Sequence, residues 1–224
     1  YPEAGEEIDK DTPPAVTKNV NITVYVDASH GCDLVTRRSV TGILLCINRT
    51  PVKWYCKRQN TIESSTYGAE LVIARIAVEM IMEYRYKLRM IGIKIEGPSV
   101  MLVDNEAVVK NTTLPSSTLK KKHNAIAYHK VREAVAAKII MVAHIRTDLN
   151  ISDILTKPKS PQDYYKFLSP VLFKREDKRE SSENQGELQL DLQSTIIQSD
   201  SQASTPNSDG EKPDLLPANQ IHSQ

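Results

Sequence analysis

Four acidic residues each stand where a segment of expected secondary structure begins or ends. They are Asp27, Glu70, Asp104 and Asp153. Carboxylates that follow hydrophobic strands are poor packing groups, but they are good ligands for hard divalent cations such as Mg²⁺. These residue types in these places indicate a metal-dependent enzyme.

The spacing of the four acids indicates how they could meet. Asp27 and Asp104 each close a short apolar run. If the two strands are adjacent and parallel, both side chains emerge at carboxyl ends, where open α/β sheets place their ligands. Glu70 and Asp153 would then come from helices that lie over those ends. Such a cluster repels itself unless cations occupy it, and two Mg²⁺ ions about 4 Å apart are the usual occupants.

The elements that must position these acids form a mixed α/β pattern. Strands are expected at residues 22–27, 40–47, 52–56, 100–104 and 138–144. Helices are expected at residues 65–90, 105–111, 119–137 and 151–157. The first three strands indicate an antiparallel meander, and the later strands alternate with helices. This order predicts a mixed sheet with helices on its faces.

The long helix carries one of the four acids on its apolar stripe. Glu70 shares a helical face with Ala77, Ile81, Tyr84 and Leu88. A glutamate near the start of a helix is also favoured by the helix dipole. The helix dipole accounts for a glutamate in the first turn, but it does not account for a glutamate on the apolar face. We therefore favour a functional role for Glu70.

Composition divides the chain into four segments. Residues 1–19 carry a net charge of −3 and are expected to form a flexible lead-in. Residues 20–160 are the expected folded domain, and residues 161–173 form a short extension that could be helical. Residues 174–224 have a net charge of −5 and no aromatic residue, which predicts a disordered acidic and polar tail. Between the tails, residues 20–173 have a net charge of +9, which suits a polyanionic substrate.

Several classes of protein are disfavoured. No apolar run is long enough to span a bilayer, and no secretory leader precedes the first strand, so we expect an intracellular protein that is not secreted. The three cysteines, Cys32, Cys46 and Cys56, form no CxxC pair and are expected to be reduced. The N-x-S/T sequons, that of Asn150 among them, are then interpreted as chance.

Seven short segments carry a resemblance to a known family. They are residues 26–30 (VDASH), 36–42 (TRRSVTG), 54–59 (WYCKRQ), 63–70 (ESSTYGAE), 103–107 (VDNEA), 121–124 (KKHN) and 151–157 (ISDILTK). In this order they resemble the ribonuclease H domain of copia-type retrotransposon polyproteins. The match covers about residues 20–160, and seven motifs in sequence are far more specific than any one of them.

The resemblance implies a fold, an activity and a site. The fold would be ribonuclease H-like, a five-stranded mixed sheet flanked by helices. The activity would be hydrolysis of the RNA strand of RNA–DNA hybrids, in a domain that follows a reverse transcriptase. Asp27, Glu70, Asp104 and Asp153 would be the catalytic and metal-binding set for two Mg²⁺ ions, with Mn²⁺ as a substitute. The chain departs from the family at Ser29, where an acidic residue is frequent, but this position is outside the catalytic four.

The resemblance also implies partners and a location. The partners would be the RNA–DNA hybrid and the upstream reverse transcriptase domain, with no membrane and no small-molecule cofactor. Retroelement enzymes work in cytoplasmic particles, and their products reach the nucleus, so either compartment is expected.

Basic and polar residues near the four acids could hold the substrate. The candidates for phosphate contact are Arg37, Arg38 and Ser39 in the first hairpin connection, and Lys121 and Lys122, which with Lys120 are expected to begin a helix. Like charges at a helix start oppose the helix dipole, so these lysines do not serve helix stability. A solvated surface is the alternative for each of them.

Four other residues allow two interpretations each. Asn105 could bind a ribose hydroxyl or a base edge, or it could cap a helix. His144 could assist product release or protonation near the metals, although a histidine with a purely structural role is the simpler interpretation. Trp54 and Tyr55 are most simply core and sheet-face residues, with base stacking as the alternative.

Three other functions are compatible with parts of the sequence pattern. An integrase core shares the fold class, but it uses fewer acidic ligands and is usually accompanied by a His/Cys zinc module. A degenerate or repurposed element fragment would bind nucleic acid without cleaving it. A structural or interaction module would act through its acidic tail.

Overall fold

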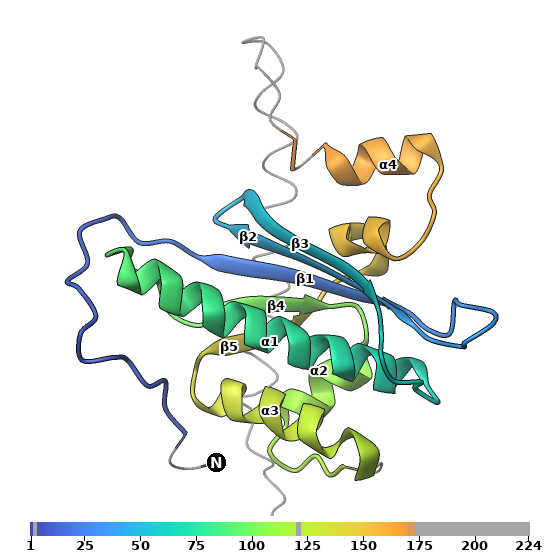
Figure 1. The fold of residues 1–224 in the computed structure, drawn as a ribbon, viewed down its shortest axis with the longest axis horizontal. Coiled ribbons are helices and arrows are strands. Elements are labelled where there is room, and N and C mark those ends of the chain that lie inside the picture. Colours follow the sequence, from blue (N-terminus) through green and yellow to red (C-terminus); the bar gives the residue numbers. More distant parts are fainter. Residues whose placement is uncertain (2–3, 120–121, 170, 173–224) are drawn as a thin grey trace, which may run out of the picture.

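The computed structural model describes residues 1, 4–119, 122–169 and 171–172 (Figure 1). The predicted tail, residues 174–224, lies outside this part of the chain. Within it, no helix combines the length and the apolar character needed to cross a bilayer. The three cysteines have free thiols, as predicted.

One five-stranded sheet organises the protein. Its strands are β1 (Ile22–Ser29), β2 (Val40–Ile47), β3 (Thr50–Arg58), β4 (Ser99–Val103) and β5 (Ile140–His144). They lie in the order β3-β2-β1-β4-β5. The strands β1, β2 and β3 form an antiparallel meander, whereas β4 pairs in parallel with both β1 and β5. The predicted five-stranded mixed sheet, an antiparallel meander joined to parallel strands, is confirmed by this order.

Helices cover the sheet. They are α1 (Thr66–Met90), α2 (Glu106–Thr113), α3 (Ala125–Ala136) and α4 (Pro161–Leu168). Three 3₁₀ turns are η1 (Lys122–Asn124), η2 (Thr147–Leu149) and η3 (Ile151–Leu155). Figure 1 shows α1 lying along the sheet with α2 and α3 beside it, whereas η3 and α4 lie on the other side.

The alternation of side chains along the strands creates two hydrophobic layers. Val24 and Val26 of β1 pack with the α1 side chains in the larger cluster. Tyr25, between them, points to the opposite face and belongs to a smaller cluster with Leu44 and Ile151. The sheet is therefore buried on both faces near its centre.

The long helix begins and ends where its sequence predicts. Ser65 is the N-cap, and its hydroxyl accepts a hydrogen bond from the amide of Gly68 at 3.3 Å. At the other end Gly92 adopts a left-handed conformation with φ +74°, which glycine tolerates without cost from a Cβ. The predicted stripe is confirmed, because Glu70 is buried together with the apolar residues of its face.

Two details of the prediction were wrong. The helix expected from residue 119 begins at Ala125, after the turn η1. Arg132 and Tyr128 of α3 donate hydrogen bonds to the carbonyls of Leu114 and Ser117, which turn the preceding segment back along α3. These bonds hold residues 114–117 in a turn against α3.

The other wrong detail concerns the edge of the sheet. Trp54 is 68% exposed instead of buried in the core. It lies on β3, the edge strand, and the hydrophobic cluster on its face ends at Leu44 and Cys46 of the neighbouring strand β2. The prediction for Tyr55 is confirmed, since it packs partly buried against the larger cluster.

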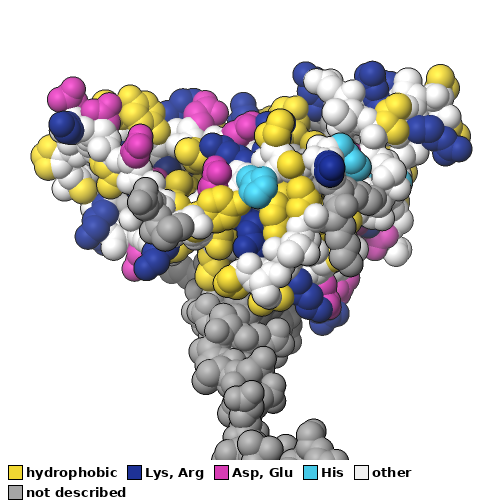
Figure 2. All heavy atoms as spheres, turned by 90° about the horizontal axis from the view of Figure 1, so that it is seen from below, with side chains coloured by type: hydrophobic (Ala, Val, Ile, Leu, Met, Phe, Trp, Pro, Cys, Tyr) yellow, Lys and Arg dark blue, Asp and Glu magenta, His cyan; other side chains and the backbone are white. Residues whose placement is uncertain are grey.

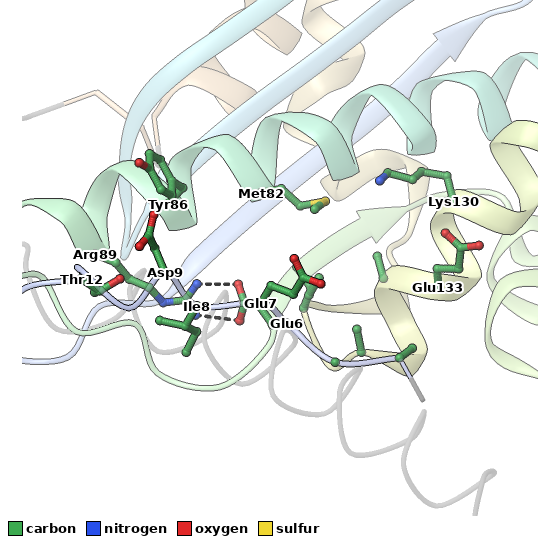
Figure 3. A pocket seen from close by; sticks show the side chains of 15 residues that line it. Glu6, Glu7, Ile8, Asp9, Thr12, Met82, Tyr86, Arg89, Lys130 and Glu133 are labelled. Carbon is green, nitrogen blue, oxygen red and sulfur yellow. Dashed lines mark hydrogen bonds and ion pairs between the residues drawn. The ribbon is translucent and has the colours of Figure 1, made fainter. Parts of the chain in front are cut away.

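The N-terminal segment is attached to the far end of α1. Glu6 accepts paired hydrogen bonds from Arg85 and from Arg89, at 2.6–2.7 Å. Figure 3 shows Glu6 and Arg89 pointing toward each other beside a cavity of about 640 Å³ between this segment and the helices α1 and α3. Residues 4–19 contain no helix or long strand, and the predicted division into four segments stays a prediction.

Candidate metal centre

Two of the predicted acids emerge side by side from the middle of the sheet. Val26 of β1 is paired with Val103, the last residue of β4. The next residue along each chain segment, Asp27 and Asp104 respectively, therefore lies at the same end of the two strands. The two strands are parallel and adjacent, as the sequence analysis assumed. Asp27 is 1% exposed, and Asp104 is half-buried.

The third acid reaches this edge from helix α1. One Glu70 oxygen, Oε1, accepts a hydrogen bond from the amide of Ala28 at 3.2 Å. The other oxygen, Oε2, is buried and has no hydrogen-bond partner. One carboxylate oxygen from each of Asp27, Glu70 and Asp104 lies within 4.8 Å of the other two. A buried carboxylate oxygen without a partner is costly, which indicates a ligand for this position.

The surroundings disfavour negative charge on all three carboxylates. Burial raises the pKa of Glu70 to about 9, and the neighbouring charges of Asp104 and Asp27 add to the shift. Burial is also the main reason that the pKa values of Asp27 and Asp104 are raised. A bound cation would reverse this cost, and three clustered carboxylates are the oxygen donors that Mg²⁺ or Mn²⁺ prefers. The residues present therefore fit a divalent cation.

The fourth acid lies next to this trio and is paired with lysines. Asp153 is in η3 and is 1% exposed. Lys157 Nζ lies 2.6 Å from Asp153 Oδ1, and Lys159 binds the other oxygen. Burial alone would raise the pKa of Asp153, but the hydrogen bonds from these two lysines outweigh it and lower the pKa. Within the described residues, the cluster with metal-binding geometry contains three of the four predicted acids.

Three side chains near the trio were missed in the sequence analysis. The hydroxyl of Thr156 donates a hydrogen bond to Asp27 Oδ2. Lys157 Nζ lies 3.6 Å from Asp27 Oδ1. Asn150, fully buried, donates a hydrogen bond to the carbonyl of Val26 at 2.8 Å and so attaches η3 to β1. Thr156 and Lys157 belong to the motif at residues 151–157. Both are about one helical turn from Asp153 along the chain, and this spacing could have indicated that they lie near it.

The trio opens into a cavity of about 340 Å³. Its lining includes Lys157 and, from the start of α2, Asn105 and Glu106. Asn105 caps α2, and its Oδ1 accepts a hydrogen bond from the amide of Ala107 at 3.0 Å. The capping interpretation is therefore borne out, and the side chain still borders the cavity.

The predicted phosphate-binding residues have different environments. Arg37 is exposed with φ +56°, and Arg38 is half-buried. Figure 2 shows several Lys and Arg side chains at the end of the molecule where the β1–β2 connection projects in Figure 1. Ser39 requires a correction, because it is fully buried and its hydroxyl accepts a hydrogen bond from the amide of Gly31 at 3.1 Å. This hydroxyl shapes the connection and is not available to a substrate.

Three further predicted site residues lie on the later part of the chain. Lys122 is exposed in η1, while Lys121 is outside the described residues. His144 ends β5, is half-buried, and its Nε2 lies 3.3 Å from the carbonyl oxygen of Asp104. His144 is therefore next to the trio through the backbone of one of its members.

Comparison with curated proteins identifies relatives over most of the folded part of the chain. It is 28% identical over 153 residues, 68% of its length, to the retrovirus-related Pol polyprotein from transposon RE1 of Arabidopsis thaliana. It is 30% identical over 134 residues, 59% of its length, to that from transposon TNT 1-94 of Nicotiana tabacum. The chain is homologous to transposon Pol polyproteins. The resemblance to copia-type elements that the seven motifs indicate is confirmed by these homologues.

The homologous Pol polyproteins are much longer than this chain, which spans about 10% of their length. No protein-family model matches the sequence. Among solved structures, the chain is similar to LC11-RNase H1 in complex with an RNA/DNA hybrid, with 14% identity and a TM-score of 0.48 over 61% of this chain and 94% of that one. It is also similar to an RNase H domain from Mycobacterium tuberculosis, with 11% identity and a TM-score of 0.48 over 62% of this chain and 91% of that one.

Proposed function

We infer that this chain is a metal-dependent endonuclease that hydrolyses the RNA strand of RNA–DNA hybrids. The observation that carries the proposal is the trio Asp27, Glu70 and Asp104, two of them buried, with the unpartnered Oε2 of Glu70 among its oxygens. The homology to Pol polyproteins supports a role in reverse transcription of a retroelement. RNA–DNA hybrid is the substrate that the seven motifs imply.

The trio would hold the divalent cation, Mg²⁺ or Mn²⁺. Bound there, the cation would activate a water molecule and stabilise the leaving oxygen of the phosphodiester. The chain would have to hold one carboxylate oxygen of each acid in place, and each of the three side chains is restrained. Asp27 is held by Thr156, Glu70 by the amide of Ala28, and Asp104 by its position at the end of β4.

Substrate contacts are proposed for groups that border the cavity or the basic end of the molecule. Asn105 uses its Oδ1 for the helix cap, which leaves its amide nitrogen for a ribose hydroxyl or base edge. Arg37, Arg38 and Lys122 would contact backbone phosphates. His144 is proposed as an auxiliary group because of its proximity to Asp104. In the parent polyprotein, a reverse transcriptase domain would precede this one.

The test is cleavage of a labelled RNA–DNA hybrid by the full chain, with Mg²⁺ or with EDTA. We expect cleavage with Mg²⁺ only, and loss of cleavage to background in Asp27→Asn with its thermal unfolding nearly unchanged. Asp11→Asn is the matched control, since Asp11 is an exposed aspartate in the N-terminal segment. Full activity of Asp27→Asn would defeat the assignment. Hybrid binding without any cutting by the wild-type chain would favour the binding-only alternative.

A further inference from the structure

A lysine side chain reaches into the carboxylate cluster. Lys157 Nζ lies 2.6 Å from Asp153 Oδ1 and 3.6 Å from Asp27 Oδ1. Its side chain also lines the cavity that Glu70 and Asp104 border. The ammonium group therefore lies between the fourth acid and the trio, the region in which a second divalent cation shared by Asp27 and Asp153 would have to bind.

The backbone that carries this lysine is fixed to the sheet. The amide of Lys157 donates a hydrogen bond to the carbonyl of Asp153 at 3.1 Å. The adjacent Thr156 binds both Asp27 and the same carbonyl through its hydroxyl. Asn150, at the start of η3, is bonded to Val26 of β1. The position of the ammonium group follows from this anchored turn and not from a freely moving chain end.

Both oxygens of Asp153, the fourth acid, are bonded to ammonium groups. Lys157 binds one oxygen of Asp153, and Lys159 binds the other. Both contacts are to a carboxylate that is 2% exposed, where the attraction between opposite charges is weakly screened. A second divalent cation at Asp153 would be repelled by two ammonium groups unless it displaced them.

We propose that Lys157 serves as a tethered second cation, so that the chain binds one divalent ion through Asp27, Glu70 and Asp104 and uses an ammonium group in place of the other. This inference rests on the proposed function for the identity of the first ion's site. It revises the expectation of two Mg²⁺ ions. An ammonium is a compact point charge, suited to a phosphate oxygen, and it requires no binding equilibrium of its own. Lys157 would be a positioning residue for Asp27 as well.

The experiment counts bound ions without substrate or turnover. Mn²⁺ is titrated into the full chain by calorimetry, and free Mn²⁺ is followed in parallel by its paramagnetic resonance signal. We expect one tightly bound ion in the wild type and two in Lys157→Met, with the second ion at least about tenfold tighter than any second ion in the wild type. Lys157→Arg keeps the charge and should stay at one. Lys166→Met, at an exposed lysine of α4, should also stay at one.

Each other outcome overturns the inference. Two equally tight ions in the wild type would show that Lys157 does not take the place of a cation. A single ion in folded Lys157→Met, as judged by its circular dichroism and thermal melt, would do the same. If Lys157→Met fails to fold, Lys157→Gln, which keeps a polar group of similar length, supplies the count. Because the proposed function is read from hybrid cleavage, a chain that binds one ion but does not cut would refute that function and leave this inference standing.

Discussion

Glu6 and Glu70 are both largely shielded from solvent, but the charges around them differ in sign. Glu6 lies beside arginines, whereas Glu70 lies beside aspartates. Glu6 binds two arginines, and although burial raises its pKa, the hydrogen bonds from Arg85 and Arg89 outweigh burial and lower the pKa to about 2. Glu70 lies between two aspartates, and burial together with their charges raises its pKa to about 9. The two ends of helix α1 thus hold one compensated carboxylate and one uncompensated carboxylate.

The difference is whether the protein itself supplies partners for the carboxylate. At Glu6, both carboxylate oxygens are bonded, so the contact attaches the N-terminal segment to the domain. At Glu70, one oxygen has no partner, and the like charges nearby favour a cation. Perturbed carboxylates of this second kind are typical of active sites, because the cost of their burial is recovered when a ligand binds.

The largest expected effect is at the compensated end. Arg85→Met leaves Glu6 with one partner and removes the hydrogen bonds to Gly97 and Ser99. Because Arg85 is 3% exposed, we expect the free energy of unfolding to fall by about 3–5 kcal/mol in urea denaturation. Arg75→Met, which breaks only an exposed pair with Glu79, should cost less than about 1 kcal/mol. Equal losses in the two variants would show that Glu6 contributes nothing beyond a surface contact.

The next effect is a gain in the free energy of unfolding, and it concerns Glu70. Between pH 4.5 and about 9, folded Glu70 holds a proton that the unfolded chain releases, so the stability of the cation-free protein falls as the pH rises. Glu70→Gln removes this dependence, and at pH 8 in EDTA it should raise the free energy of unfolding by about 2 kcal/mol. The same variant should lose the rise in Tm that Mg²⁺ gives the wild type. Destabilisation at pH 8 in EDTA would contradict this account of Glu70.

The smallest effect concerns Glu6 at low pH. The pKa of Glu6 is about 2 in the folded protein and 4.5 in the unfolded chain, so the unfolded chain binds the extra proton between these values. Stability from this contact is therefore complete above pH 4.5 and lost as the pH falls toward 2. We expect a loss of about 1–2 kcal/mol over this range relative to Glu6→Gln, measured by urea denaturation at each pH. Parallel pH profiles for the two proteins would remove Glu6 from the acid response.

Much of the fold follows from local patterns that the sequence displays. The alternating apolar runs predicted all five strands, and the cap at Ser65 with the stop at Gly92 bounded the longest helix. These signals succeed because they depend on neighbouring residues alone. The start of α3 was predicted too early because long-range hydrogen bonds from Arg132 and Tyr128 decide where the preceding turn runs. The exposure of Trp54 likewise depends on its strand being at the edge.

Residue type and order were enough to identify the candidate metal ligands, because carboxylates that follow apolar strands or lie on the apolar face of a helix can be recognised without a structure. Asp27, Glu70 and Asp104 were expected to meet, and they do. The approach of Lys157 to within 3.6 Å of Asp27 could not be read from the chain order. Electrostatic pairing acts over a few ångströms, and these two residues come that close only because η3 packs on β1.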